Sequence, residues 1–432
     1  MTKGTRHLQL HSVVSLPCSG SFYKLVVALF GVSGGLSFFT LTAMLYYRLS
    51  LAGVPVCTVG RLSWAAIPYS IRFFWPYLVD AVRIPYLSRT FGQRKSWGLV
   101  THHISIACFL LVGYINPAEN LHLLFSIVLI SSFAAAVQDI VSETYRFDVV
   151  NVLPINASAP SHTFGFRSGK LFACSVVPYF ASKIGWFEIH CIISVVKVLA
   201  LFLLFFLHEP GNAVRGDRQE LPSQCVIRRS IITTIVSAFQ KKGVWIFLCV
   251  FMIMKAIDVV VGPMETSFIG KIGIPPGDYG KFKGGIGGSI SLIGVMLAGP
   301  FVRRVSLNCG VMLSAIGLSV AGCLSIVLMH LPLDAPCFNT VFAAIAIVQE
   351  FCIAFMMTFS AIYTSAFCEK SDSIYYFSLF SSIGSVGRVT LTYMFSELCH
   401  VTGWVVIFLL PLGLCVPLFW LLKRDFSKEQ KI

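Results

Sequence analysis

The chain has 432 residues, of which 56% are hydrophobic and only 12% are charged, and its mean hydropathy is +0.80. A soluble domain has about 25% charged residues, so this composition excludes a water-soluble protein and predicts an all-α, polytopic membrane protein. The formal net charge is +14. Because the basic residues gather in alternate loops, we attribute this charge to membrane topology and anionic lipid headgroups, and we expect no nucleic-acid partner.

A membrane-spanning helix needs about 20 mainly apolar residues. Reading the chain for that length predicts about twelve spans, divided equally between its two halves. The first half holds Tyr23–Tyr46, Leu62–Val79, Gly98–Ile115, Leu121–Val141, Phe164–Ile184 and Phe187–Leu207. The second half holds Val244–Val261, Gly284–Val302, Leu307–Leu331, Phe338–Ala361, Ile374–Phe395 and Val401–Leu422.

The longest polar segment, residues 208–242, separates the two sets of spans. We therefore predict a six-helix bundle over residues 1–207, a linker over 208–242 and a second bundle over 243–432. Two such halves are typical of transporters that bind a small molecule near the bilayer midplane between them and expose the site to each side in turn.

Lysine and arginine in the loops predict the orientation of the chain. They are concentrated at the N-terminus, in Asp80–Trp97, in Tyr145–Lys170, in the linker and in the C-terminal tail. Both termini are therefore predicted to be cytoplasmic. Arg48 and Arg61 in the first outer loop, and the basic stretch Lys271–Lys283, are exceptions to this rule.

The loop between the second and third spans has a distinctive order of charges. Asp80 ends the second span, and Gly92, Arg94 and Lys95 follow before the third. An acidic helix end beside a basic loop can form a charge network that holds two helices in one arrangement, so we predict a cytoplasmic gating loop. The alternative is an ordinary positively charged cytoplasmic loop.

Ionisable side chains inside membrane spans are costly and are usually paired or functional. Asp139 and Glu143 share one helix face at the end of the fourth span, where they could instead pair with Arg146 as a helix-end cluster. Lys197 stands in the sixth span without an evident partner. The remaining candidates are Arg72 in the second span, Lys255 and Asp258 in the seventh, Glu350 in the tenth and Arg388 in the eleventh.

Two internal ion pairs compete with functional roles for these residues. Lys255 and Asp258 are three residues apart and could pair with each other, while Glu350 could bridge to Arg388. Low dielectric favours the neutral form of a carboxylate, which then can take up and release a proton. Glu350, Asp139 and Glu143 are accordingly the candidate proton-coupling residues, and Glu350 leads them unless Arg388 pairs with it.

Catalytic and metal-binding patterns are missing from the sequence. The 14 cysteines are scattered and form no C-x-x-C pair, and no H-E-x-x-H or G-x-S-x-G motif occurs. The run Gly284-Gly285-x-Gly287-Gly288 precedes no Lys-Ser pair, so close helix packing explains it better than nucleotide binding. We predict no cofactor, no metal and no enzymatic activity.

Several segments together resemble the AmpG-type muropeptide permeases, a branch of the major facilitator superfamily that also includes acetyl-coenzyme A transporters. The matching segments follow the family's order along the chain. They are Ile67-Pro68-Tyr69, Arg72–Asp80, Gly92–Trp97, Gln138-Asp139-Ile140, Glu143–Arg146, Lys255–Asp258, Glu350, Phe377–Ser382 and Ser385–Arg388. The sequence departs from the family pattern at Ala81, which replaces Arg, and at Tyr376, which replaces a common Gln.

This resemblance implies a major facilitator transporter of the bacterial inner membrane that imports anhydro-muropeptides by proton symport, as a monomer. The alternatives are another anionic or amphiphilic solute, such as a coenzyme A ester, or, from a different class, a polytopic membrane enzyme. The candidate substrate contacts are Arg72, Trp75, Lys255, Asp258, Tyr376 and Arg388.

Overall fold

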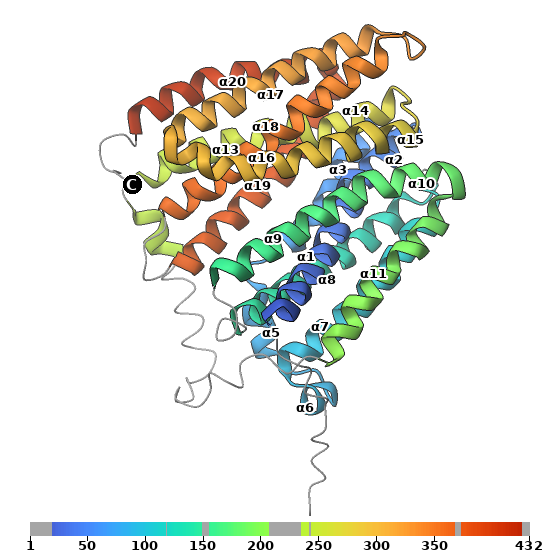
Figure 1. Ribbon diagram of the computed structural model, residues 1–432, viewed down its shortest axis with the longest axis vertical. Helices are drawn as coiled ribbons and strands as arrows, with labels where there is room; N and C mark the ends of the chain where they lie inside the picture. Colours follow the sequence, from blue (N-terminus) through green and yellow to red (C-terminus); the bar gives the residue numbers. More distant parts are fainter. Residues whose placement is uncertain are drawn as a thin grey trace, which may run out of the picture.

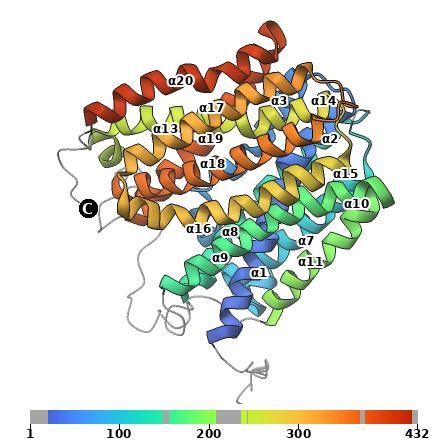
Figure 2. The same ribbon diagram turned by 45° about the horizontal axis from the view of Figure 1, so that its top comes forward.

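The computed structural model describes residues 20–117, 119–148, 155–206, 235–241, 243–367 and 373–425, and all regular structure within these ranges is helical. Each of the predicted spans except the second corresponds to one continuous helical segment. Two groups of helices lie side by side, one from each half of the chain (Figures 1 and 2). The predicted all-α architecture is therefore confirmed.

Helices of the first half are continuous except in the second span. They are α1 Gly20–Phe39, η1 Thr40–Met44 and α2 Leu45–Leu51; α3 Val56–Leu62, η2 Ser63–Ala66, α4 Ile67–Ser70 and α5 Trp75–Ala81; the short α6 Leu87–Thr90; α7 Gln93–Tyr114; α8 Leu121–Asp148; α9 Ile155–Leu171, η4 Phe172–Val176 and α10 Val177–Ile184; and α11 Trp186–Phe206.

The second half also contains six helical spans. They are α13 Val244–Val259, η5 Val260–Met264 and α14 Glu265–Lys271; α15 Pro276–Tyr279, η6 Gly280–Ile286 and α16 Gly287–Arg304; α17 Leu307–His330; α18 Phe338–Phe367; α19 Ser373–Thr402; and α20 Trp404–Asp425. Residues 235–240, within the predicted linker, are also helical, and Ala238 is buried in the core of this half.

Several predicted boundaries were wrong, and the errors matter for the site. The second span is broken at residues 71–74, where the helix restarts at Trp75 with Pro76 in its first turn, a position that suits a residue without an N–H. The fifth span begins at Ile155 instead of Phe164, and the eighth begins at Pro276 instead of Gly284. The earlier start of the eighth span brings Lys283, which is predicted to lie in a loop, into the bundle.

Eight helices in the described part of the chain are long and apolar enough to cross a membrane by length and composition alone. The second, fifth, eighth and eleventh predicted spans are not among them. Large apolar side chains are exposed along α11 and α20, for example Leu199, Phe202, Val416 and Phe419. A continuous apolar exterior of this kind is expected where helices face lipid.

Glycines let α1 and α9 pack with their backbones in contact. Gly31 and Gly35 on α1, and Gly165 and Gly169 on α9, each stand four residues apart and face the partner helix. A Cβ atom at Gly35 would lie 2.2 Å from the Phe166 carbonyl oxygen. Small residues at four-residue spacing are the usual means of close helix association in membranes.

The two halves also meet through glycines. A Cβ atom at Gly284 in η6 would lie 2.0 Å from the carbonyl oxygen of Cys174 in η4. This confirms close packing as the reason for the glycine run at 284–288. On the other side of the interface, α3 packs along α19, where Ser63 Oγ donates to the Val389 carbonyl at 3.1 Å.

Arg48, an exception to the charge rule for loops, caps a helix end. Its guanidinium in α2 donates to the carbonyl oxygens of Val112 at 2.6 Å and Ile115 at 3.0 Å, and it lies 5.1 Å from the centre of the Trp186 ring. A cation at the C-terminus of α7 satisfies carbonyls that have no helical partner and interacts favourably with the helix dipole. Its position is therefore explained without reference to topology.

Lys197 lies in α11 and is 1% exposed. Its ammonium group contacts the hydroxyl of Ser37 on α1 and donates to Ser105 Oγ on α7 at 2.9 Å. The sequence indicated no partner for Lys197. The structure supplies two hydroxyl groups, which lie on two other helices of the first half.

Candidate functional site

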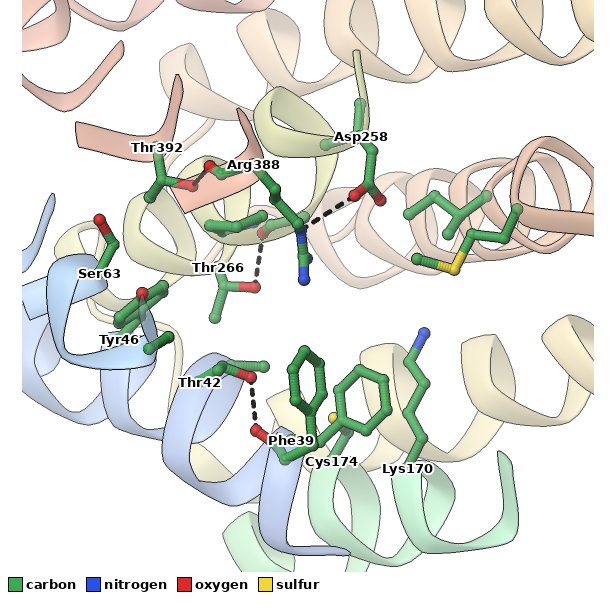
Figure 3. Close-up of a pocket in the computed structure, with 18 of the residues that line it drawn as sticks. Phe39, Thr42, Tyr46, Ser63, Lys170, Cys174, Asp258, Thr266, Arg388 and Thr392 are labelled. Atoms are coloured by element: carbon green, nitrogen blue, oxygen red, sulfur yellow. Dashed lines mark hydrogen bonds and ion pairs between the residues drawn. The ribbon is translucent and has the colours of Figure 1, made fainter. Parts of the chain in front are cut away.

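A cavity of about 140 Å³ lies between the two halves of the chain (Figure 3). The described side chains that line it come from seven spans, three in the first half and four in the second. The first half contributes Phe38, Phe39, Thr42, Ala43, Tyr46, Ser63, Ala66, Tyr69, Ser70, Arg167, Lys170 and Cys174; the second contributes Asp258, Val261, Gly262, Pro263, Thr266, Tyr279, Lys283, Glu350, Ile353, Met357, Ser385, Arg388, Val389 and Thr392.

The π-helical segments of the described residues, η1, η4, η5 and η6, all border this cavity. They contribute Thr42, Cys174, Val261 and Lys283, among others. A π-helical turn displaces the side chains that follow it and breaks the regular hydrogen-bond ladder, and such turns are frequent at functional sites. At η5 the cause is visible in the sequence, because Pro263 has no N–H to donate.

A buried ion pair joins the two halves across the cavity. Lys170 Nζ on α9 lies 2.5 Å from Glu350 Oε2 on α18, with the two side chains only 12% and 6% exposed. Lys283 lies 3.9 Å from the other carboxylate oxygen of Glu350 and pairs with Glu265 at 2.6 Å. Charge-assisted contacts of this kind are strong when buried, and breaking one leaves an uncompensated charge.

Gln349 completes this network on the side of the second half. Its side-chain oxygen accepts from Lys283, and its amide donates to the carbonyl of Val261 in η5. The network therefore connects α14, η6 and α18 behind the ion pair that crosses to α9.

Arg388 on α19 forms a second ion pair at the cavity wall, at 3.0 Å from Asp258 Oδ2 on α13. The two atoms are close but not aligned as a hydrogen bond, so the contact is mainly electrostatic. Figure 3 shows this pair on the wall opposite Lys170, Phe39 and Cys174. Both partners belong to the second half of the chain.

The first half forms an aromatic wall of the cavity from Phe38, Phe39 and Tyr69, and Phe166 packs against Phe38 and Phe39. Phe38 lies 5.2 Å from Tyr69 and 6.2 Å from Phe166, and Phe39 lies 5.8 Å from Phe166 between ring centres. The Tyr69 hydroxyl donates to Asp139 Oδ2 at 2.6 Å. Rings at these distances contact one another along their edges and faces, and they give the cavity an apolar surface across from the Arg388–Asp258 pair.

Glu350, Asp258 and Arg388 are the predicted site residues that line the cavity. Asp139 lies behind Tyr69. Arg72 donates to Ser381 Oγ across the two halves at 2.9 Å, and Trp75 donates to the Pro68 carbonyl at 2.6 Å. The side chains of Glu143, Tyr376 and Asp80 lie outside the described residues.

Neither of the two internal ion pairs considered from the sequence is formed. Lys255 extends over the Phe251 ring, 5.3 Å from its centre, because helical side chains point back toward the preceding turn. Asp258 lines the cavity and forms an ion pair with Arg388. Glu350 forms its ion pair with Lys170 instead of Arg388. The sequence spacing was compatible with the predicted pairs, but the neighbouring helices supplied better placed partners.

The predicted gating loop is held by backbone contacts in its described part. Gly92 has a φ of 92° immediately before α7, a conformation that favours glycine. Lys95 donates to the Phe205 carbonyl near the end of α11 at 2.7 Å and lies 5.7 Å from the Phe91 ring centre. These contacts position the loop on the first bundle, and its gating role remains a prediction.

Four charged residues of the network were missed from the sequence: Arg167, Lys170, Glu265 and Lys283. Arg167 and Lys170 fall within the predicted fifth span but were counted with the basic stretch Tyr145–Lys170. Glu265 follows the predicted end of the seventh span, and Lys283 precedes the predicted start of the eighth. Arg167, Lys170 and Cys174 follow helical spacing and share one face of the fifth span, which is the signal that could have found them.

No group of three or more His, Cys, Asp and Glu side chains in the described ranges is arranged to hold a metal ion.

The fold is that of the major facilitator transporters. The solved structure of a D-xylose–proton symporter superposes with a TM-score of 0.69 at 14% identity, covering 95% of this chain and 99% of that one. No family model matches the chain.

Within that class, the chain is similar along almost its whole length to AmpG permeases, as the motifs indicated. The anhydromuropeptide permease of Escherichia coli K12 is 23% identical over 399 residues, which are 91% of this chain and 77% of the relative. The transporter AmpG 4 of Rickettsia conorii is 24% identical over 398 residues, 92% and 94% of the two chains.

Proposed function

We propose that this protein is a secondary active transporter that carries anhydro-muropeptides into the cytoplasm across a bacterial inner membrane, coupled to proton symport. The observation that carries the proposal is the charged and aromatic cavity between the two halves of a major facilitator fold, in a chain similar throughout to an anhydromuropeptide permease. A sugar–peptide offers rings for the aromatic wall and carboxylates for the cations.

Lys170 and Glu350 come from opposite halves, so their ion pair is a contact that rocking of the halves would make and break. That is the property required of a residue pair at an alternating-access site.

Uptake into proteoliposomes tests the proposal. We expect a labelled anhydro-muropeptide to accumulate when a proton gradient is imposed and to equilibrate without accumulation when the gradient is collapsed. Accumulation of a coenzyme A ester with no uptake of murein fragments would identify the ester, and not the muropeptide, as the substrate. Chemical conversion of the fragment without transport would favour the membrane-enzyme alternative, and absence of uptake for every compound would contradict transport.

The orientation is tested by labelling single cysteines in a cysteine-free variant. Because Lys and Arg favour the cytoplasmic side, we expect Cys at position 219 to be protected from an impermeant reagent in intact cells and Cys at position 118 to react. The original residues are Gln219 and Ala118. Labelling of position 219 from outside would reverse the proposed orientation.

Asp80→Asn tests the gating loop. Asp80 is the last residue but one of α5, next to the basic loop that contains Arg94. Removing its charge is expected to lower the transport rate severalfold while the amount of protein in the membrane stays the same. Rates are measured in proteoliposomes at equal protein content. A wild-type rate would leave the loop with a role in topology only.

A further inference from the structure

The cations of the cavity are not all matched by carboxylates. Lys170 pairs with Glu350, Lys283 with Glu265, and Arg388 with Asp258, each within 4.0 Å. Arg167 is the remaining cation among the described residues that line the cavity. One positive charge is therefore left over in this part of the molecule.

Arg167 has a weak partner in the described structure. Its guanidinium donates to the Met357 sulfur at 3.8 Å. Among the described residues, no carboxylate forms an ion pair with it within 4 Å. A thioether is a poor acceptor, whereas a guanidinium offers five N–H donors in a planar fork. A charged group this deep in a bundle is costly unless it is paired, so the arrangement favours an anion supplied by a ligand.

The backbone around Arg167 fixes where that anion would bind. Gly165 and Gly169 hold α9 against α1, so Arg167 is placed on a helix that cannot easily shift. Phe166 precedes it and contacts Phe38 and Phe39 of the aromatic wall. Lys170, one turn further along α9, lies 5.5 Å from the Phe39 ring centre. The guanidinium of Arg167 therefore lies beside the aromatic wall.

We propose that Arg167 is a specificity-determining residue that binds a carboxylate of the transported sugar–peptide while the sugar rings contact Phe38, Phe39 and Tyr69. This inference rests on the proposed function and adds the requirement that the substrate be an anion. A guanidinium binds a carboxylate through two parallel hydrogen bonds, a geometry that the single ammonium group of lysine does not provide.

The test compares two forms of one anhydro-muropeptide, with its carboxylates free or converted to amides, by calorimetry on the purified full chain in nanodiscs. We expect the wild type to bind the acid at least about tenfold more tightly than the amide, a ratio worth about 1.4 kcal/mol. Arg167→Gln should weaken binding of the acid by about tenfold and leave binding of the amide unchanged, so that the preference disappears.

Two further variants make the result decisive. Arg61→Gln removes an arginine of α3 that is exposed and lies outside the cavity, and it should bind as the wild type does. Arg167→Lys keeps the charge, so it should retain a preference for the acid with lower affinity. If Arg167→Gln does not fold, an Arg167→Lys protein with wild-type affinity for the acid would overturn the proposal.

The outcomes separate this inference from the proposed function. If the wild type binds neither form, muropeptide transport itself is contradicted. If the wild type binds both forms equally, or if Arg167→Gln keeps the preference for the acid, the substrate can still be a muropeptide but Arg167 is not its anchor.

Discussion

Glu350→Gln is expected to abolish uptake driven by a proton gradient while substrate exchange continues. A symporter needs a group that changes its protonation between the two states of the cycle, whereas exchange requires no net proton movement. Glu350 lines the cavity and contacts a lysine from the opposite half, so its environment changes when the halves move. Uptake and exchange are measured in the same proteoliposome preparation.

The same substitution is expected to destabilise the folded protein. Removing one partner of a buried ion pair costs roughly 3–5 kcal/mol because the other charge stays buried without compensation. The double variant Lys170→Met, Glu350→Gln should recover much of this stability without recovering gradient-driven uptake. Thermal melting of the purified proteins measures the first effect, and the uptake assay measures the second.

Glu397→Gln is the matched control. Arg61 and Glu397 also come from opposite halves and lie 3.1 Å apart, but their side chains are 64% and 33% exposed. Solvent screening makes such a pair contribute little, so this variant should melt and transport as the wild type does. Accumulation of substrate against a gradient by Glu350→Gln would move the coupling site elsewhere, and Asp139, held by Tyr69, would become the leading candidate.

Gly35→Ala is expected to disrupt the packing of α1 on α9. Its Cβ would lie 2.2 Å from the Phe166 carbonyl oxygen, a backbone atom that cannot move without displacing α9. Overpacking of this kind costs about 1–3 kcal/mol. Because α9 carries Arg167 and Lys170, the displacement should also reduce substrate binding. The melting temperature in detergent and the fraction of monodisperse protein are the measurements.

Gly413→Ala provides the comparison for the same chemical change. Gly413 lies inside α20, and no atom stands within 4 Å of the position its Cβ would take. In an open helical position alanine is favoured over glycine by about 1 kcal/mol, so this variant should be as stable as the wild type or slightly more stable. Equal melting temperatures for the two variants would show that the α1–α9 contact adapts at little cost.

Hydropathy alone determined the class and the approximate plan of this protein. The membrane environment requires long apolar helices. Because the apolar residues of such a helix are consecutive in the sequence, spans such as Leu121–Val141 and Leu307–Leu331 could be found by length and composition. The order of short motifs indicated the relationship to AmpG permeases before any comparison. Glu350, Asp258 and Arg388 were identifiable as candidates because a charge inside an apolar run is rare.

The less apolar spans were harder to delimit for a physical reason. The second, fifth, eighth and eleventh spans do not meet the length and composition of a membrane-crossing helix, and each contributes polar or charged side chains to the cavity. Their cavity-facing residues resemble loop residues in composition. Lys170 and Lys283 were consequently read as topology signals, although both lie inside the bundle and surround Glu350.

Only the tertiary structure decided which charges meet. Sequence spacing limits contacts within one helix, but it does not determine which helices are neighbours or how a long side chain is directed. Lys255 and Asp258 are three residues apart and could have paired. Instead, Lys255 extends over the Phe251 ring, and Arg388 of α19 forms the ion pair with Asp258. The pairing of Lys170 with Glu350 depends on glycines that bring α9, α1 and the second half together, and that proximity arises only when the helices pack.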